Sequence, residues 1–69
     1  MRIALNGKEE FLEQSTTIKE FIAIRNWDPA SIVVELNLAI VGREDWANIV
    51  LRDNDQLEIL RFVGGGGAV

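Results

Sequence analysis

Apolar and polar positions alternate in the first residues of the chain. Ile3 and Leu5 have the two-residue spacing of a strand with one buried face, and a second extended segment follows them. Asn6-Gly7 separates the two segments, and both residues accept the positive φ angles that a type I′ turn requires. This pattern predicts an N-terminal β-hairpin.

The apolar spacing changes to that of a helix after residue 17. Thr17 stands three residues before Glu20, the spacing of a capping box in which each residue bonds a free backbone N–H of the other. The apolar residues that follow share one helical face: Ile18, Phe21 and Ile22. We therefore expect a helix over residues 18–25, and we expect Asp28-Pro29 to prevent its continuation.

The middle of the chain predicts two strands and a short helix. Residues 31–37, "SIVVELN", are rich in β-branched residues and typical of a strand buried on much of both faces. Residues 40–41 have the character of a short strand. The acidic start of "REDWANIV", at residues 43–50, suits the first turn of a brief helix. We expect Trp46 to anchor this helix.

The last part of the chain predicts a turn followed by a strand. Asp53-Asn54-Asp55 favours a turn because Asx side chains bond their own backbone, and Asn54 tolerates left-handed angles. Residues 56–63, "QLEILRFV", predict the final strand, with Leu57 and Ile59 facing inward.

This order of elements predicts an α+β protein with the ββαββ plan of a β-grasp domain. We expect a mixed sheet of four to five strands with one main helix, and the first and last strands in parallel at its centre. The domain is expected to span residues 1–63, followed by a flexible glycine-rich tail at residues 64–69. The expected core is Ile3, Leu5, Ile18, Phe21, Ile22, Val34, Leu57 and Ile59.

Composition narrows the chemistry that the chain can perform. Its 69 residues include no Cys, His or Tyr, which excludes disulfides and thiolate zinc sites and removes the commonest general base. The net charge of −4 argues against nucleic acid as a partner, because nucleic-acid affinity depends on clustered cations. The acidic residues show no metal-ligating spacing. We expect no metal site and no catalytic side chains, so the chain is not predicted to be an enzyme.

The remaining sequence signals concern location. No apolar run approaches the ~18 residues that a membrane span needs. The N-terminal segment becomes charged too early for a secretory signal. We therefore expect a cytoplasmic protein that does not bind membranes.

The end of the chain, "RFVGGGGAV", carries the strongest functional signal. Four glycines at a terminus add no stability, but a segment without side chains can pass through a narrow channel of another protein. Leu60, Phe62 and Val63 precede them and lie outside the expected core positions. Apolar side chains gathered beside such a segment predict a docking surface for a partner.

Several segments together resemble the ThiS family, the small ubiquitin-like sulfur carriers of thiamine biosynthesis. They are "NGKE", "VVELN" followed by "IVGREDWAN", "DNDQLEILRFV" and the glycine-rich end, and the resemblance covers nearly the whole chain. It implies a ubiquitin-like β-grasp fold. It also implies a carrier that acts as a co-substrate of other enzymes.

The resemblance implies two enzyme partners. A ubiquitin-activating-like adenylyltransferase of the ThiF type would use ATP to convert the C-terminal carboxylate to an acyl-adenylate, which a sulfur donor would turn into a thiocarboxylate. Thiazole synthase of the ThiG type would then take the sulfur. The carrier itself would hold no cofactor, and Gly64 and Gly65 would belong to the tail that reaches these active sites.

The chain departs from the family pattern at two places. Ala68-Val69, and arguably Gly67 as well, lie beyond the expected terminal glycine. A peptidase, with a JAMM-type metalloprotease as the candidate, is therefore expected to remove the extra residues and expose Gly66 or Gly67; the sequence leaves both open. Leu38 stands where relatives often have glycine. A tight turn at Asn37-Leu38 would strain Leu38, so we expect a longer or differently shaped connection.

Two alternative functions remain open from the sequence. A carrier for molybdopterin, cysteine or another sulfur metabolite would share the fold and the glycine end. A non-covalent β-grasp interaction module would share the fold without the chemistry.

Overall fold

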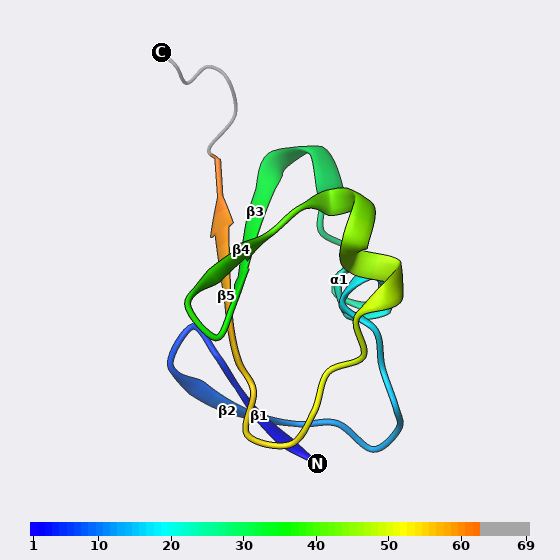
Figure 1. Cartoon of the computed structure of the whole chain (residues 1–69), viewed down its shortest axis with the longest axis vertical. Helices are drawn as coiled ribbons and strands as arrows, with labels where there is room; N and C mark the ends of the chain where they lie inside the picture. The colour runs from blue at the N-terminus through cyan, green and yellow to red at the C-terminus, as the bar shows by residue number, and fades with distance from the viewer. Residues whose placement is uncertain (63–69) are drawn as a thin grey trace.

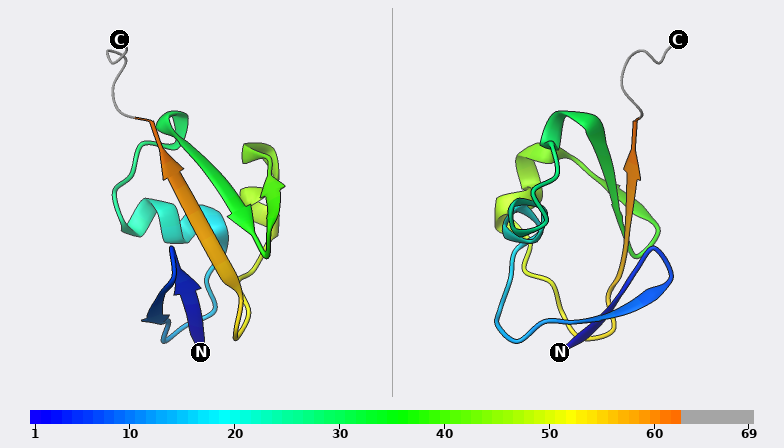
Figure 2. Two further views of the ribbon diagram at one scale, coloured as in Figure 1. Left: turned by 90° about the vertical axis from the view of Figure 1, so that its left-hand side faces the viewer. Right: turned by 180° about the vertical axis from the view of Figure 1, so that it is seen from behind.

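The computed structural model describes residues 1–62 and has one helix packed against a five-stranded mixed sheet (Figure 1). The strand order is β2-β1-β5-β3-β4, and the first and last strands, β1 and β5, pair in parallel as expected. The elements are β1 (Arg2–Leu5), β2 (Lys8–Phe11), α1 (Ile18–Ile24), β3 (Ile32–Leu36), β4 (Ala39–Val41) and β5 (Gln56–Arg61), with 3₁₀ helices η1 (Pro29–Ser31) and η2 (Arg43–Asn48). Figure 2 shows α1 and η2 together on one side of β3 and β5.

The N-terminal hairpin forms as predicted. Leu5 is paired with Lys8, and the two residues between them both have positive φ: 49° at Asn6 and 84° at Gly7. Asn6 also extends the pairing of β1 with β5 beyond its own strand. Its Oδ1 accepts the backbone N–H of Ile59 at 2.8 Å, so the turn helps to hold the last strand.

The helix begins at the predicted capping box. The Oγ1 of Thr17 accepts from the backbone N–H of Glu20 at 3.1 Å, and Oε1 of Glu20 accepts from the N–H of Thr17 at 2.9 Å. The helix ends before it reaches Pro29, because Asn26 adopts φ 61° and turns the backbone away. The helix thus ends within one residue of the predicted Arg25 and does not continue through Asp28-Pro29, which begin η1 instead.

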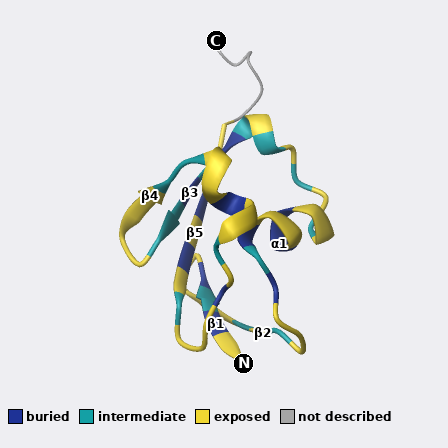
Figure 3. Cartoon of the chain, turned by 45° about the vertical axis from the view of Figure 1, so that its right-hand side comes forward, coloured by how far each residue is buried: buried dark blue, intermediate teal, exposed yellow. Residues whose placement is uncertain are grey.

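The core lies between the sheet and the layer formed by α1 and η2 (Figure 3). All eight residues expected in the core are buried. The structure adds Ile32, Leu51 and Trp46, which is only 3% exposed. The indole Nε1 of Trp46 donates to the carbonyl of Val41 at 3.2 Å, so this side chain anchors η2 to the end of β4.

The expectation of a longer connection at Asn37-Leu38 was wrong. Leu36 pairs with Ala39, leaving a two-residue turn in which φ is 51° at Asn37 and 74° at Leu38. The side chain of Asn37 stabilises the turn: its Oδ1 accepts the N–H of Gln56 at 2.9 Å and its Nδ2 donates to Asp55 at 3.0 Å. These bonds hold Leu38 in a conformation that branched and bulky residues avoid.

Replacing Leu38→Gly is expected to stabilise the protein by about 0.5–1 kcal/mol. Glycine removes the ~1–2 kcal/mol cost of a left-handed side-chain-bearing residue, and it gives back part of this gain through a more flexible unfolded chain. Little packing is lost because Leu38 is 82% exposed. Urea unfolding measures the change, with Leu38→Ala as the control that keeps a Cβ; equal stability of the two variants would contradict the strain.

Candidate functional site

The candidate site is the end of β5, from which the chain continues into the predicted tail. Arg61 pairs with Ile32 on β3, and the backbone N–H of Phe62 donates to the carbonyl of Ser31 at 2.8 Å. Val63 and the four tail glycines lie outside the described residues, as does the predicted domain boundary. The predicted site residues that lie outside are Val63, Gly64, Gly65, Gly66 and Gly67.

Two of the three predicted docking residues are described, and both are exposed. Leu60 is 51% exposed and Phe62 is 63% exposed. Leu60 alternates with buried Ile59, which places it on the side of the sheet away from α1. Val33 lies directly opposite Leu60 on β3 and adds apolar surface to the same side. We call Leu60, Phe62 and Val33 the docking strip; partner binding by this strip stays a prediction.

Arg61, between the two docking residues, contacts the other layer of the protein. Its guanidinium carbon lies 5.6 Å from the centre of the Trp27 ring, and that of Arg25 lies 5.8 Å from the same ring. Arg25 is in turn bonded to Glu10 on β2. This cation–π contact ties the end of β5 to the segment after α1 and separates Arg61 from the side that carries Leu60.

Sequence reasoning missed Val33, Trp27 and Asn6 as parts of this region. Val33 becomes part of the strip only through the register of β3 against β5. Trp27 meets Arg61 across a long chain separation. The Asn-Gly pattern signalled the turn at Asn6 but gave no sign that its side chain bonds β5.

Asp28 stabilises η1, the short helix that ends at Ser31. The carbonyl oxygen of Ser31 accepts the hydrogen bond from the backbone N–H of Phe62. Bonds to the Asp28 carboxylate from the backbone N–H of Ala30 and the hydroxyl of Ser31 lower the pKa of Asp28 below its ordinary 3.8, with a smaller contribution from the charge of Arg43. The ionised carboxylate is therefore the form that supports η1.

Asp28 is expected to make stability depend on pH in acid. Because its folded pKa is depressed, its contribution is present above pH 3.8 and is lost as the pH falls through the folded value. The stability advantage of the native chain over Asp28→Asn should therefore shrink as the pH falls from ~6 to ~2.5. Urea unfolding measures this difference, and a carboxyl-carbon NMR titration gives the midpoint. A midpoint at or above 3.8 would contradict the assignment.

Metal-binding clusters and membrane-spanning helices are both absent from residues 1–62. This part of the chain contains no group of three or more side chains positioned to hold a metal ion. None of the helices described by the structure is long and apolar enough to cross a membrane.

Comparison with known proteins decides the family. The family model described as the ThiS family matches residues 1–66, from the first strand into the glycine run. The chain belongs to the ThiS family of sulfur carrier proteins. This membership agrees with the resemblance inferred from the sequence.

Relatives and solved structures agree with the ThiS assignment. The sulfur carrier protein ThiS of Bacillus subtilis is 37% identical over 65 residues, covering 93% of this chain and 98% of that protein. The crystal structure of the thiamine biosynthesis protein (ThiS) from Geobacter metallireducens superposes with a TM-score of 0.80 at 30% identity, covering 96% of this chain and all of the other. The ThiS-like β-grasp fold is thereby confirmed.

A second kind of relative is much longer. A protein of Magnetococcus marinus named thiazole synthase is 36% identical over 66 residues, which are 96% of this chain and 20% of that protein. One from Paramagnetospirillum magneticum is 35% identical over the same length and share. The ThiS-family chain thus spans about a fifth of these relatives, and their ThiS-like segment belongs to a polypeptide named for thiazole synthesis.

Proposed function

We propose that this ThiS-family protein carries sulfur as a thiocarboxylate on a C-terminal glycine, for thiazole formation in thiamine biosynthesis. The observation that carries the proposal is the family match over residues 1–66, which extends from the folded domain into the glycine run. A reactive group at the chain end needs no nucleophilic side chain, and the sequence has no Cys, His or Tyr.

The proposed chemistry takes place in a partner's active site. The terminal carboxylate attacks the α-phosphorus of ATP and pyrophosphate leaves, giving an acyl-adenylate. Sulfur supplied at the oxidation level of hydrosulfide then attacks the acyl carbon; a C–S bond forms as the C–O bond to AMP breaks, so that one carboxylate oxygen is replaced by sulfur. The partner is an adenylyltransferase of the ThiF type, and ATP belongs to that enzyme.

The carrier's part is to present its end to that active site. Leu60 and Phe62 of the docking strip come shortly before the glycines in the sequence, and with Val33 they would seat the domain on the enzyme's surface. Val63 would extend this contact. The glycines would then reach the adenylation site, since they accept whatever backbone angles a channel imposes.

We further propose that Ala68-Val69 is removed before activation, together with Gly67 if the terminal glycine is Gly66. The match to the family model ends at Gly66, which supports a terminus at Gly66; a cut directly before Ala68 would leave Gly67. A carboxylate on Val69 would carry a β-branched side chain into a site that resembles one built for glycine. A peptidase of the JAMM type is the proposed agent.

Thiazole synthase of the ThiG type is the proposed acceptor of the sulfur. Support comes from the proteins named thiazole synthase that contain a segment similar to this chain, because fusion keeps a carrier beside the enzyme that it serves.

The thiazole assignment is tested by offering the thiocarboxylated protein to two acceptors. We expect thiazole synthase with its small-molecule substrates to consume the thiocarboxylate at least ~10-fold faster than the large subunit of molybdopterin synthase with its substrate, because docking and tail insertion must both fit for transfer. Loss of the sulfur mass, followed by mass spectrometry, measures consumption. Faster consumption by the molybdopterin enzyme would move the carrier to that pathway.

A further inference from the structure

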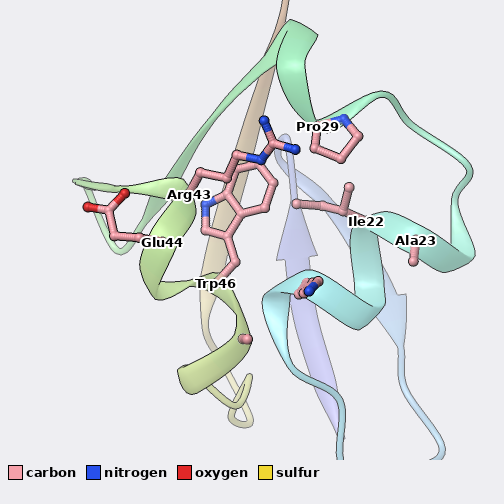
Figure 4. Close-up of a pocket in the computed structure, with 8 residues that line it drawn as sticks. Ile22, Ala23, Pro29, Arg43, Glu44 and Trp46 are labelled. Carbon is pink, nitrogen blue, oxygen red and sulfur yellow. The ribbon is translucent and has the colours of Figure 1, made fainter.

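A groove lies between α1 and η2 (Figure 4). Both elements lie on one side of β3 and β5, whereas strand alternation and register place Leu60 and Val33 on the other side. Its volume of about 560 Å³ is within the range of protein ligand sites. Buried Ile22 and Trp46 form its apolar floor, and Pro29 lies at one end. The groove stays open because the residues facing it from the two helical elements, Ala23 and Ala47, are small.

Two cations line the groove without a local partner. Neither Lys19 nor Arg43 forms an ion pair with any residue in the described part of the chain. Glu44 also lines the groove, but Figure 4 shows its carboxylate directed away from Ile22 and Pro29, while the guanidinium of Arg43 lies beside Pro29.

Of the nearby acidic side chains, Asp28 is hydrogen-bonded and Glu44 lies over the backbone of Gly42. The carboxylate of Glu44 covers Gly42, where an added Cβ would meet its Oε2 at 2.5 Å. Asp28 accepts bonds from Ala30 and Ser31, and the charge of Arg43 affects the pKa of Asp28 less than those bonds do. The groove therefore combines an apolar floor with a positive rim, on a protein whose net charge is −4.

We propose that this groove binds an acidic, apolar peptide segment of a protein partner. One apolar side chain of the peptide packs on Ile22 and Trp46 between the two alanines, and flanking carboxylates face Lys19 and Arg43. The charge of the rim selects an acidic segment. A peptide fits better than a free small molecule because the groove is only partly enclosed, whereas small-molecule sites bury most of the ligand surface.

This surface is independent of the proposed carrier chemistry. The sheet separates the groove from the docking strip, so one partner can occupy the groove while Leu60 and Phe62 contact another (Figure 2). Binding at the groove therefore requires no ATP, no sulfur and no particular C-terminal residue.

The test is an NMR titration of the ¹⁵N-labelled full chain with capped five-residue peptides. The probe has the sequence Asp-Asp-Phe-Asp-Asp, and the matched control replaces every Asp by Lys. The net charge of −4 favours the basic control, so a preference for the acidic probe must arise from a local positive site. The two indole N–H signals report position, with Trp46 at the groove and Trp27 outside it.

We expect the acidic probe to bind at least ~5-fold more tightly than the basic control and to shift the signals of Trp46, Ala23 and Ala47. Ala47→Leu fills the groove and should weaken binding by ~10-fold or more. Ala39→Leu adds the same side chain at an exposed position on β4 and should leave binding unchanged. Arg43→Gln and Lys19→Gln should each weaken it roughly 2- to 5-fold, as for exposed ion pairs.

Three outcomes would overturn the proposal. The first is tighter binding of the basic peptide, and the second is unchanged binding by Ala47→Leu, whose folding is checked by its amide spectrum. The third is phenylacetate binding as tightly as the acidic peptide, which would make the groove a small-molecule anion site. Because no carrier chemistry enters the titration, its failure leaves the proposed function untouched.

Discussion

Phe62→Ala is expected to weaken binding to a ThiF-type adenylyltransferase by about 5- to 150-fold, or 1–3 kcal/mol. An aromatic ring that is 63% exposed in the free protein and lies directly before the tail has the properties of an anchor at the centre of an interface. The fold should persist, because the ring is outside the core and the bond from the Phe62 N–H to Ser31 is a backbone bond.

Phe11→Ala is the matched control for this experiment. Phe11 is 71% exposed and lies at the end of β2, away from the end of β5 that carries Phe62. The control should bind as the native chain does, and urea unfolding should show both variants folded. The docking strip is wrong if Phe62→Ala binds normally, or if the two variants lose affinity equally.

Local sequence signals predicted the parts of the fold that depend on local chemistry. The capping box at Thr17 and Glu20 fixed the start of α1, and Asn6-Gly7 fixed the hairpin, because these residues bond groups within a few positions of themselves. The strand spacing of Leu57 and Ile59 correctly placed the buried side of β5, which in turn placed Leu60 on the opposite side. The exposed part of the candidate site was therefore predictable.

What the sequence could not supply depends on contacts between distant segments. The left-handed turn at Leu38 looks unfavourable by itself, and it is tolerated because Asn37 bonds Asp55 and Gln56 on the chain before and within β5. The burial of Trp46 depends on η2 packing against α1. Val33 joins the docking strip only through strand register, which an alternating pattern does not specify.

The second large effect concerns the end of the chain. Full-length protein is expected to be a poor substrate for thiocarboxylation compared with a form that ends at Gly66 or Gly67. Val69 displaces the carboxylate from the position of a terminal glycine and adds a branched side chain beside it. A displacement of even ~1 Å from the reactive geometry can cost ~10²-fold in rate, so we expect a difference of at least that size.

The measurement that tests the carrier function most directly is the intact mass of these three forms after incubation with a cognate adenylyltransferase, ATP and a sulfur donor. We predict that a truncated form gains the mass difference between sulfur and oxygen, about 16 Da, while full-length protein gains it at least ~10²-fold more slowly. Equal reaction of the full-length protein would contradict tail removal and leave the carrier function intact. If neither truncated form gains the sulfur mass with an enzyme that modifies another ThiS carrier, the proposed thiocarboxylate chemistry is contradicted.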